Sequence, residues 1–180
     1  IGAGHLGSFH AQQLKSMKDC KLVAIYDIVK KNALKVANEQ QIPHYDDLTK
    51  LFKKCDAVSV CTPATVHFQN TLEALENDCH VFIEKPLTNN LLNGQQILDA
   101  NIVHKKIIQV GHIERFNEAY LSYKNYMSDP LFIESHRLTP FNVRGLDVPV
   151  VLDLMIHDLD LILSLVPHKI SNISASGTKV

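Results

Sequence analysis

Four short apolar runs, separated by segments with helical spacing, constrain the fold of this chain more than any other feature. The runs are Lys21–Tyr26, Ala57–Cys61, Val81–Ile83 and Lys106–Val110. They are apolar almost throughout rather than alternating, which is typical of strands buried on both faces of a parallel sheet. The segments between them are long enough for crossover helices. The sequence therefore predicts an α/β fold built on a doubly wound parallel sheet.

The helices of this first part are predicted from the spacing of apolar residues and from the residues that interrupt it. Phe68, Leu72 and Leu75 illustrate the pattern, because they fall on one face of a helix. We expect helices over about 5–17, 30–40, 47–53, 66–77 and 91–101. Together with the strands, these make residues 1–113 one doubly wound domain whose first strand is represented only by its last residue, Ile1.

The alternation of strands and helices ends after Gly111, and residues 114–180 have a different pattern. Here we expect a helix over 117–127, a strand over 132–138, a loop over 140–149, a long apolar helix over 150–166 and a strand over 169–175. This mixture is typical of an α+β domain. A sheet needs more strands than these, so we expect 114–180 to be the beginning of a truncated second domain in a longer polypeptide.

Composition and charge exclude several classes of protein. The chain has 18 basic and 19 acidic residues, a net charge of −1 and no run of like charge, which argues against a nucleic-acid or membrane-surface partner. No signal peptide and no apolar span of membrane length are visible. The four cysteines contain no C-x-x-C pair; they are Cys20, Cys55, Cys61 and Cys79. We expect reduced, mostly buried thiols in a cytoplasmic protein.

The segment Gly2–Gly7 reads GAGHLG, a G-x-G-x-x-G pattern. In such a turn the first glycine permits the tight bend, the second lets a pyrophosphate approach the backbone, and the third lets the helix pack on the strand. The free N–H groups of the helix start then face the phosphates. The candidate cofactor contacts in this segment are Gly2, Gly4, His5, Leu6 and Gly7.

Asp27 lies 20 residues after Gly7, at the end of the next predicted strand. A carboxylate in this position accepts hydrogen bonds from the ribose hydroxyls of the adenosine and repels a 2′-phosphate. The alternative without a cofactor is a tight glycine turn with an unrelated, solvated aspartate. Spacing and context together favour the first interpretation, with NAD preferred over NADP.

Thr62-Pro63 follows the run Ala57–Cys61, and His67 comes four residues after Pro63. On residue types alone, these form a turn at a strand end and an exposed histidine on a helix. The alternative is a loop that lines the cofactor, with Thr62 near its nicotinamide half. We keep Thr62, Pro63 and His67 as candidate cofactor contacts.

The run Val81–Ile83 ends in Glu84-Lys85-Pro86, at the strand end where open α/β sheets bind ligands. One interpretation is a surface ion pair followed by a turn proline. In the other, Lys85 handles protons, because burial and nearby cations can make a lysine a usable base near neutral pH. Glu84 would then orient the lysine or pack behind the cofactor, so both residues are candidates for the cofactor edge.

Asp153 and His157 are spaced i, i+4 on the long predicted helix, and therefore share one face. Asp158 and Asp160 lie on the same helix, and four ionisable groups are costly there unless they face solvent or a ligand. A histidine with an acid one turn earlier suits proton transfer. A solvated polar stripe is the plain alternative. A metal site is a weaker one, since the chain shows neither a convincing third ligand nor an H-E-x-x-H pattern.

With these motifs assembled, the chain resembles the Gfo/Idh/MocA family of NAD(P)-dependent sugar oxidoreductases. The motifs occur in the order and approximate spacing of that family, over essentially the whole chain: GAGHLG, CTPATVH, HVFIEKPL, GHIERFN and LDLMIHDLDLI. The E-K-P after the predicted strand is the most specific of them. The D-x-x-x-H of Asp153 and His157 is the next.

The resemblance implies a Rossmann domain followed by an α+β domain whose open sheet shapes a substrate pocket and often an oligomer interface. It implies that Lys85 is catalytic, that Pro86 follows a cis peptide bond, and that Asp153 and His157 lie over the substrate. The chain is most similar to the branch that oxidises the 3-hydroxyl of nucleotide-linked N-acetylated sugars. That branch often has proline where this chain has Glu118.

The function expected from these residues is that of an NAD-dependent dehydrogenase, in which a sugar hydroxyl gives its proton to Lys85 or to His157. Which of the two is the immediate base is left open by the sequence. The alternative is a dinucleotide-binding regulator without turnover. The presence of Lys85, Asp153 and His157 together favours the enzyme. We also expect a homo-oligomer formed through residues 114–180.

Overall fold

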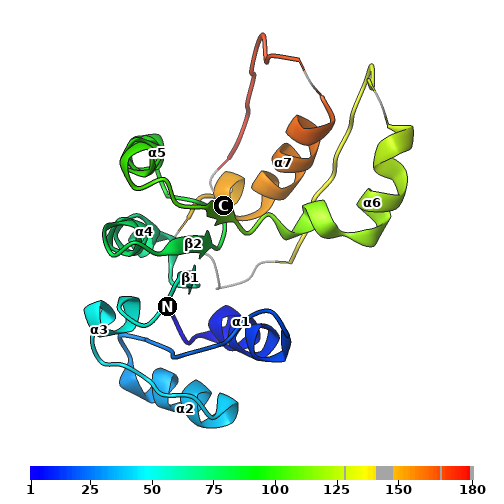
Figure 1. The fold of residues 1–180 in the computed structure, drawn as a ribbon. Helices are drawn as coiled ribbons and strands as arrows, with labels where there is room; N and C mark the ends of the chain where they lie inside the picture. The colour runs from blue at the N-terminus through cyan, green and yellow to red at the C-terminus, as the bar shows by residue number, and fades with distance from the viewer. Residues whose placement is uncertain (128, 141–147, 167, 179–180) are drawn as a thin grey trace.

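The fold is centred on a three-stranded parallel sheet. The computed structural model describes residues 1–127, 129–140, 148–166 and 168–178 (Figure 1). The strands are β1 (Ala57–Val60), β2 (His80–Ile83) and β3 (Ile108–Val110), in the order β1-β2-β3. The central strand β2 pairs on both sides, so that Val81 lies opposite both Val58 and Ile108. Three of the four strands predicted for residues 1–113 are thereby confirmed.

The helices follow the predicted segments, with shifts of a few residues at their ends. The α-helices are α1 (His5–Ser16), α2 (Lys30–Gln40), α3 (Leu48–Phe52), α4 (His67–Glu76), α5 (Leu91–His104), α6 (Glu118–Tyr123) and α7 (Ile156–Leu165). Shorter turns of helix are η1 (Ala64–Val66), η2 (Ile113–Phe116), η3 (Lys124–Tyr126) and the π-helical η4 (Val151–Met155). Side chains cap three of the starts: Asp47 accepts from Thr49, Asn90 from Asn93 and Asn117 from Ala119.

Helices cover both faces of the sheet. One face carries alternate apolar residues of β1 and β2, which pack with Leu75 of α4 in the main buried cluster: Val58, Val60, Val81 and Ile83. Side chains alternate along a strand, so Ser59 and Phe82 point to the opposite face. There they contact His10 of α1. The doubly wound arrangement is confirmed, with α4 and α1 on opposite sides of the sheet (Figure 1).

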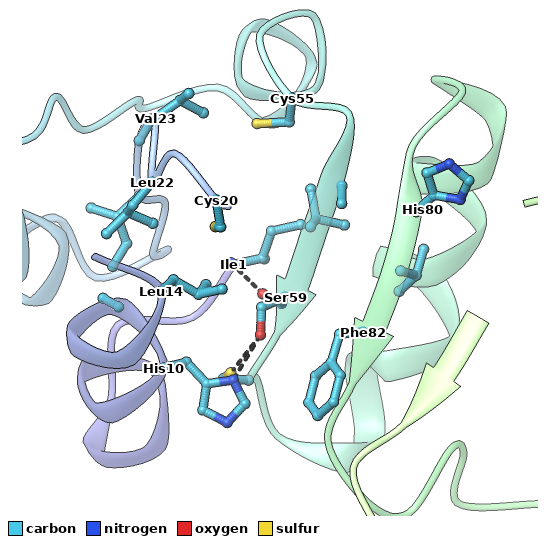
Figure 2. Close-up of a pocket in the computed structure, with 18 of the residues that line it drawn as sticks. Ile1, His10, Leu14, Cys20, Leu22, Val23, Cys55, Ser59, His80 and Phe82 are labelled. Atoms are coloured by element: carbon cyan, nitrogen blue, oxygen red, sulfur yellow. Dashed lines mark hydrogen bonds between the residues drawn. The ribbon is translucent and has the colours of Figure 1, made fainter. Parts of the chain in front are cut away.

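The predicted strand Lys21–Tyr26 is wrong as a full strand, since it forms only one isolated bridge, between Ile25 and His44. A groove of about 310 Å³ lies between this stretch and β1 (Figure 2). Ile1 enters the groove, where its backbone nitrogen donates to the Ser59 carbonyl oxygen at 2.7 Å. Ile1 and Gly2 lie between the stretch and β1, because the Gly2 N–H donates to the Tyr26 carbonyl oxygen and the Cys61 N–H donates to the Ile1 carbonyl oxygen, both at 2.8 Å. The stretch is therefore not adjacent to β1 and forms no ladder with it.

The second part of the chain matches its prediction less well. The expected strands over 132–138 and 169–175 are not formed, because among the described residues no backbone hydrogen bond joins them to a neighbouring strand. The long helix is present as η4 followed by α7, but it is not buried. Its apolar residues form an exposed row, here called the α7 stripe: Val151, Met155, Leu159 and Leu163, exposed by 41% to 54%. Most of the expected loop 140–149 lies outside the described residues.

The cysteines and the helix lengths test two further predictions. All four cysteines are free thiols, but only Cys79 is buried, and the other three are partly exposed. The prediction of mostly buried thiols is therefore wrong for Cys20, Cys55 and Cys61. Within the described ranges, no helix combines the length and the apolar character that a membrane crossing requires.

Candidate active site

The glycine turn has the geometry that its pattern predicts. Gly2 has a φ of +87°, and a Cβ there would lie 2.7 Å from the carbonyl oxygen of Cys61. A Cβ on Gly7 would overlap the carbonyl oxygen of Gly2, whereas nothing lies within 4 Å of a Cβ on Gly4. The chain itself thus closes around the first and third glycines and leaves the second open. This cradle fits the pyrophosphate of a dinucleotide.

Two other predicted cofactor contacts lie beside the turn. His5 and Leu6, in the first turn of α1, are both exposed. The carboxylate of Asp27 accepts from the Ala3 backbone N–H at 2.6 Å and from the Val29 N–H at 2.7 Å. Because each carboxylate oxygen has a second lone pair, Asp27 retains capacity to accept from ribose hydroxyls.

The loop after β1 differs from its prediction at one residue. The expectation of an exposed His67 is wrong, because its side chain is 1% exposed. Its Nδ1 lies 2.8 Å from the Pro86 carbonyl oxygen, and its Nε2 lies 2.8 Å from the Thr62 carbonyl oxygen. His67 therefore ties the Thr62 loop to the turn after Lys85 from inside the protein. Thr62 and Pro63 lie nearer the surface, at the carboxyl end of β1.

Lys85 is directed toward the second part of the chain. Its Nζ donates to the carbonyl oxygen of Asp153 at 2.7 Å and to the Asp153 carboxylate at 2.8 Å. The peptide bond between Lys85 and Pro86 is cis, as the resemblance implied. The structure thus brings together residues 68 positions apart, at the sheet edge where the cofactor turn also lies.

The polar residues of the long helix divide into two groups. Asp153 and His157 lie near Lys85, and burial, followed by the charges of Lys85 and Arg137, lowers the pKa of His157. Its Nδ1 is buried and, within the described residues, has no hydrogen-bond partner. The solvated-stripe alternative is therefore not what the structure shows for this pair.

Asp158 and Asp160 belong to the second group, which is structural. Arg137 donates two hydrogen bonds to Asp158, at 2.7 and 3.0 Å, and Arg115 donates two to Asp160, both at 2.7 Å. These bonds lower the pKa of both carboxyl groups. Neither arginine was predicted as a site residue. A signal for Arg115 was present, because it lies four residues after Gly111, in the GHIERFN motif.

His10 is a further residue that the sequence analysis did not identify. It lies in α1, and its Nε2 is 2.8 Å from a carboxylate oxygen of Glu84. Glu84 therefore faces α1, behind the edge toward which Lys85 extends. Across the described portion of the chain, no three His, Cys, Asp or Glu side chains are grouped so as to hold a metal ion.

Taken together, a glycine cradle, a carboxylate beside it and a lysine–aspartate–histidine group at one sheet edge are typical of a dinucleotide-binding α/β protein. Comparison with known proteins identifies the family. Residues 1–112 match the model of the oxidoreductase family with an NAD-binding Rossmann fold, Gfo/Idh/MocA, and the chain belongs to this family.

Individual relatives are dehydrogenases of sugars and inositols. The chain is 35% identical over 179 residues to UDP-N-acetylglucosamine 3-dehydrogenase of Acidithiobacillus ferrooxidans, covering 98% of this chain and 56% of that protein. It is 27% identical over 191 residues to inositol 2-dehydrogenase/D-chiro-inositol 3-dehydrogenase of Halalkalibacterium halodurans, covering 99% of this chain and 55% of that protein. A solved structure of the Acidithiobacillus enzyme superposes with a TM-score of 0.93 and 33% identity, over 100% of this chain and 59% of that one. The chain thus spans little more than half the length of these relatives.

Proposed function

We propose that the whole protein is an NAD-dependent oxidoreductase that moves a hydride between the nicotinamide and a secondary hydroxyl of a sugar. The observation that carries the proposal is the contact of Lys85 with Asp153 at the edge where the glycine turn and Asp27 lie. His157, whose pKa is lowered first by burial and then by the charge of Lys85, completes the group. Converging groups of this kind, one of them a histidine with a lowered pKa, are what proton transfer requires.

The cofactor would be held by the cradle of Gly2, Gly4 and Gly7, by Asp27 and by the Thr62 loop. The open space at Gly4 supports this assignment. NAD is proposed over NADP because the carboxylate of Asp27 would repel a 2′-phosphate. When bound, the cofactor supplies the hydride acceptor, and the protein supplies orientation and proton handling.

The two candidate bases have different surroundings. Lys85 donates to two oxygens of Asp153, which holds its amine in place as a donor toward a substrate oxygen. His157 has a lowered pKa and a buried Nδ1 with no partner among the described residues. A neutral imidazole can accept a proton near pH 7. We therefore infer that His157 is the immediate base and that Lys85 orients the hydroxyl.

The substrate we propose is a nucleotide-linked N-acetylated sugar, oxidised at its 3-hydroxyl. The support is the relative at 35% identity, named for that reaction on UDP-N-acetylglucosamine. A cyclic polyol such as inositol is the other substrate class that the relatives suggest. Oligomerisation through residues 114–180 also remains a proposal, and the α7 stripe offers an apolar face for it.

Steady-state kinetics of the full-length protein would test the function. With NAD and a panel of nucleotide sugars and inositols, Lys85→Ala and His157→Ala should each lower kcat by about 10²- to 10⁴-fold. The affinity for NAD, measured by calorimetry, should change little, because neither side chain belongs to the pyrophosphate cradle. Lys35→Ala, which removes an exposed lysine of α2, serves as the control.

Full turnover by Lys85→Ala on a confirmed substrate would disprove the proposed mechanism. Tight binding of NAD by the wild-type protein, without hydride transfer to any member of the panel, would instead favour a non-catalytic regulator with the same fold.

A further inference from the structure

A histidine of α1 and the glutamate next to Lys85 form a shielded pair on the other side of β2. His10 Nε2 lies 2.8 Å from Glu84 Oε1, and the two side chains are only 23% and 16% exposed. The other ring nitrogen, Nδ1, lies 2.8 Å from the Ser59 hydroxyl of β1. Figure 2 shows this second contact at the end of the groove. The helix opened by the glycine turn is thus joined to the strand that carries Lys85.

The contacts of the ring suit an imidazolium. One N–H can donate to the Glu84 carboxylate and the other to the Ser59 hydroxyl oxygen, whose own proton can go to the Cys61 sulfur 3.5 Å away. The nearby Cys61 sulfur and then the hydrogen bond to Glu84 raise the pKa of His10 to about 10. At neutral pH the ring is therefore cationic.

The carboxylate of Glu84 is held in place by the same contacts. Burial raises the pKa of Glu84, but the hydrogen bond and the charge of His10, together with the backbone N–H and the charge of Lys85, bring the net pKa below its usual value. The pair is then a carboxylate with an imidazolium, and has no net charge.

This neutral pair matters because Glu84 is the immediate neighbour of Lys85. The charge of Lys85 acts on Glu84, so an uncompensated carboxylate at Glu84 would in turn stabilise the ammonium form of the lysine. We propose that His10 is a positioning residue, which orients Glu84 and cancels its charge at Lys85. The proposal rests on the proposed function in one respect, namely that Lys85 orients the substrate hydroxyl at this site.

Other charged groups around the lysine stay the same when His10 is changed. The residues that face Lys85 or His157 from the second part of the chain and from the edge of the sheet are Asp153, His157, Arg137, Glu114 and His112. Those that face His10 are Glu84 and Cys61. If changing His10 shifts the pH at which Lys85 reacts, a double variant that also removes the Glu84 charge can therefore show whether Glu84 causes the shift.

The test is competitive acetylation of the full-length protein with acetic anhydride across a range of pH, with Lys85 followed by peptide mass spectrometry. Only the free amine reacts, so the profile reports protonation without any need for turnover. In His10→Gln the pH of half-maximal labelling should rise by about half to one unit, because Glu84 is no longer compensated. In His10→Gln/Glu84→Gln it should return to the wild-type value.

Two controls keep the result specific. Lys15, exposed in α1, is the internal reference for reagent reactivity, and His104→Gln, at the end of α5, is the matched histidine variant. A merely structural role for His10 would leave the double variant as perturbed as the single one. No shift in His10→Gln, or an equal shift in the double variant, would overturn the proposal.

If His10→Gln does not fold, the wild-type protein still provides a test. Nitrogen chemical shifts of the ¹⁵N-labelled imidazole at pH 8 should show both ring nitrogens of His10 protonated, and a neutral tautomer there would overturn the proposal. The two inferences fail separately. A labelling shift without any hydride transfer would refute the proposed function alone, whereas Lys85-dependent turnover without the shift would refute the role of His10 alone.

Discussion

Residues 1–111 and the described part of 112–178 are stabilised in different ways. Among the described residues, every buried side chain lies before Gly111, and most belong to the two apolar clusters around the sheet and α2. In the described part of 112–178, no residue is buried. Paired ions dominate there instead, between Arg115 and Asp160 and between Arg137 and Asp158.

The difference shows how the two parts of the candidate site are held in position. Strand β2, which ends two residues before Lys85, is positioned by burial, which is non-directional and strong. The helical segment that carries Asp153 and His157 meets this region through Lys85 itself, whose Nζ lies 2.8 Å from the Asp153 carboxylate. The site is thus a polar contact between a packed region and one that exposes much of its apolar surface. Three predictions test that view.

The largest effect is expected from truncating matched leucines in the two regions. In the full-length protein, Leu75→Ala should lower the free energy of unfolding by about 3 kcal/mol, because it opens a cavity in the core. Leu75 is 0% exposed, whereas Leu163 in α7 is 54% exposed, so Leu163→Ala should cost less than about 1 kcal/mol. Urea denaturation measures both. Equal losses in the free energy of unfolding would show that the α7 stripe is packed like the core, and would contradict the proposed difference between the two regions.

A smaller effect is expected when the polar contact between the regions is removed. Lys85→Met keeps the length of the side chain but loses both bonds to Asp153. Amide hydrogen exchange in 151–165 should accelerate by about five- to tenfold, the loss expected for a partly exposed charged contact. Exchange in β2 should not change. Lys35→Met is the control, and acceleration throughout the sheet would contradict the division into two regions.

The smallest effect concerns pH. The folded-state pKa of His157 is lowered, chiefly by burial, so the unfolded chain takes up this proton more readily than the folded one. Stability from the neutral ring is present above the ordinary pKa of histidine, near 6.5, and is lost as the pH falls below it. Thermal midpoints between pH 7.5 and 5 should therefore fall more steeply in the wild type than in His157→Gln.

His168→Gln, which removes an exposed histidine of the same region, provides the comparison for that measurement. Its midpoints should follow those of the wild type across the whole range. A wild-type slope equal to that of His157→Gln would mean that the ring is not shielded from water.

Much of the first region could be predicted because its signals are local. Strands such as Val81–Ile83 and the α4 row of Phe68, Leu72 and Leu75 are visible as apolar periodicity. The failures occurred where a strand needs a partner that periodicity does not reveal. Lys21–Tyr26 and residues 132–138 have strand-like composition, yet neither has a full neighbouring strand among the described residues.

The sequence by itself determined which groups reach the cofactor edge, since the carboxyl ends of parallel strands share one side of a sheet. That is why the glycine turn, Asp27 and Lys85 could be assigned to one site. Only the tertiary structure decided the partners of His10 and His67. His10 and Glu84 are 74 residues apart, and their contact depends on how α1 lies across the sheet, a geometry that no local pattern encodes.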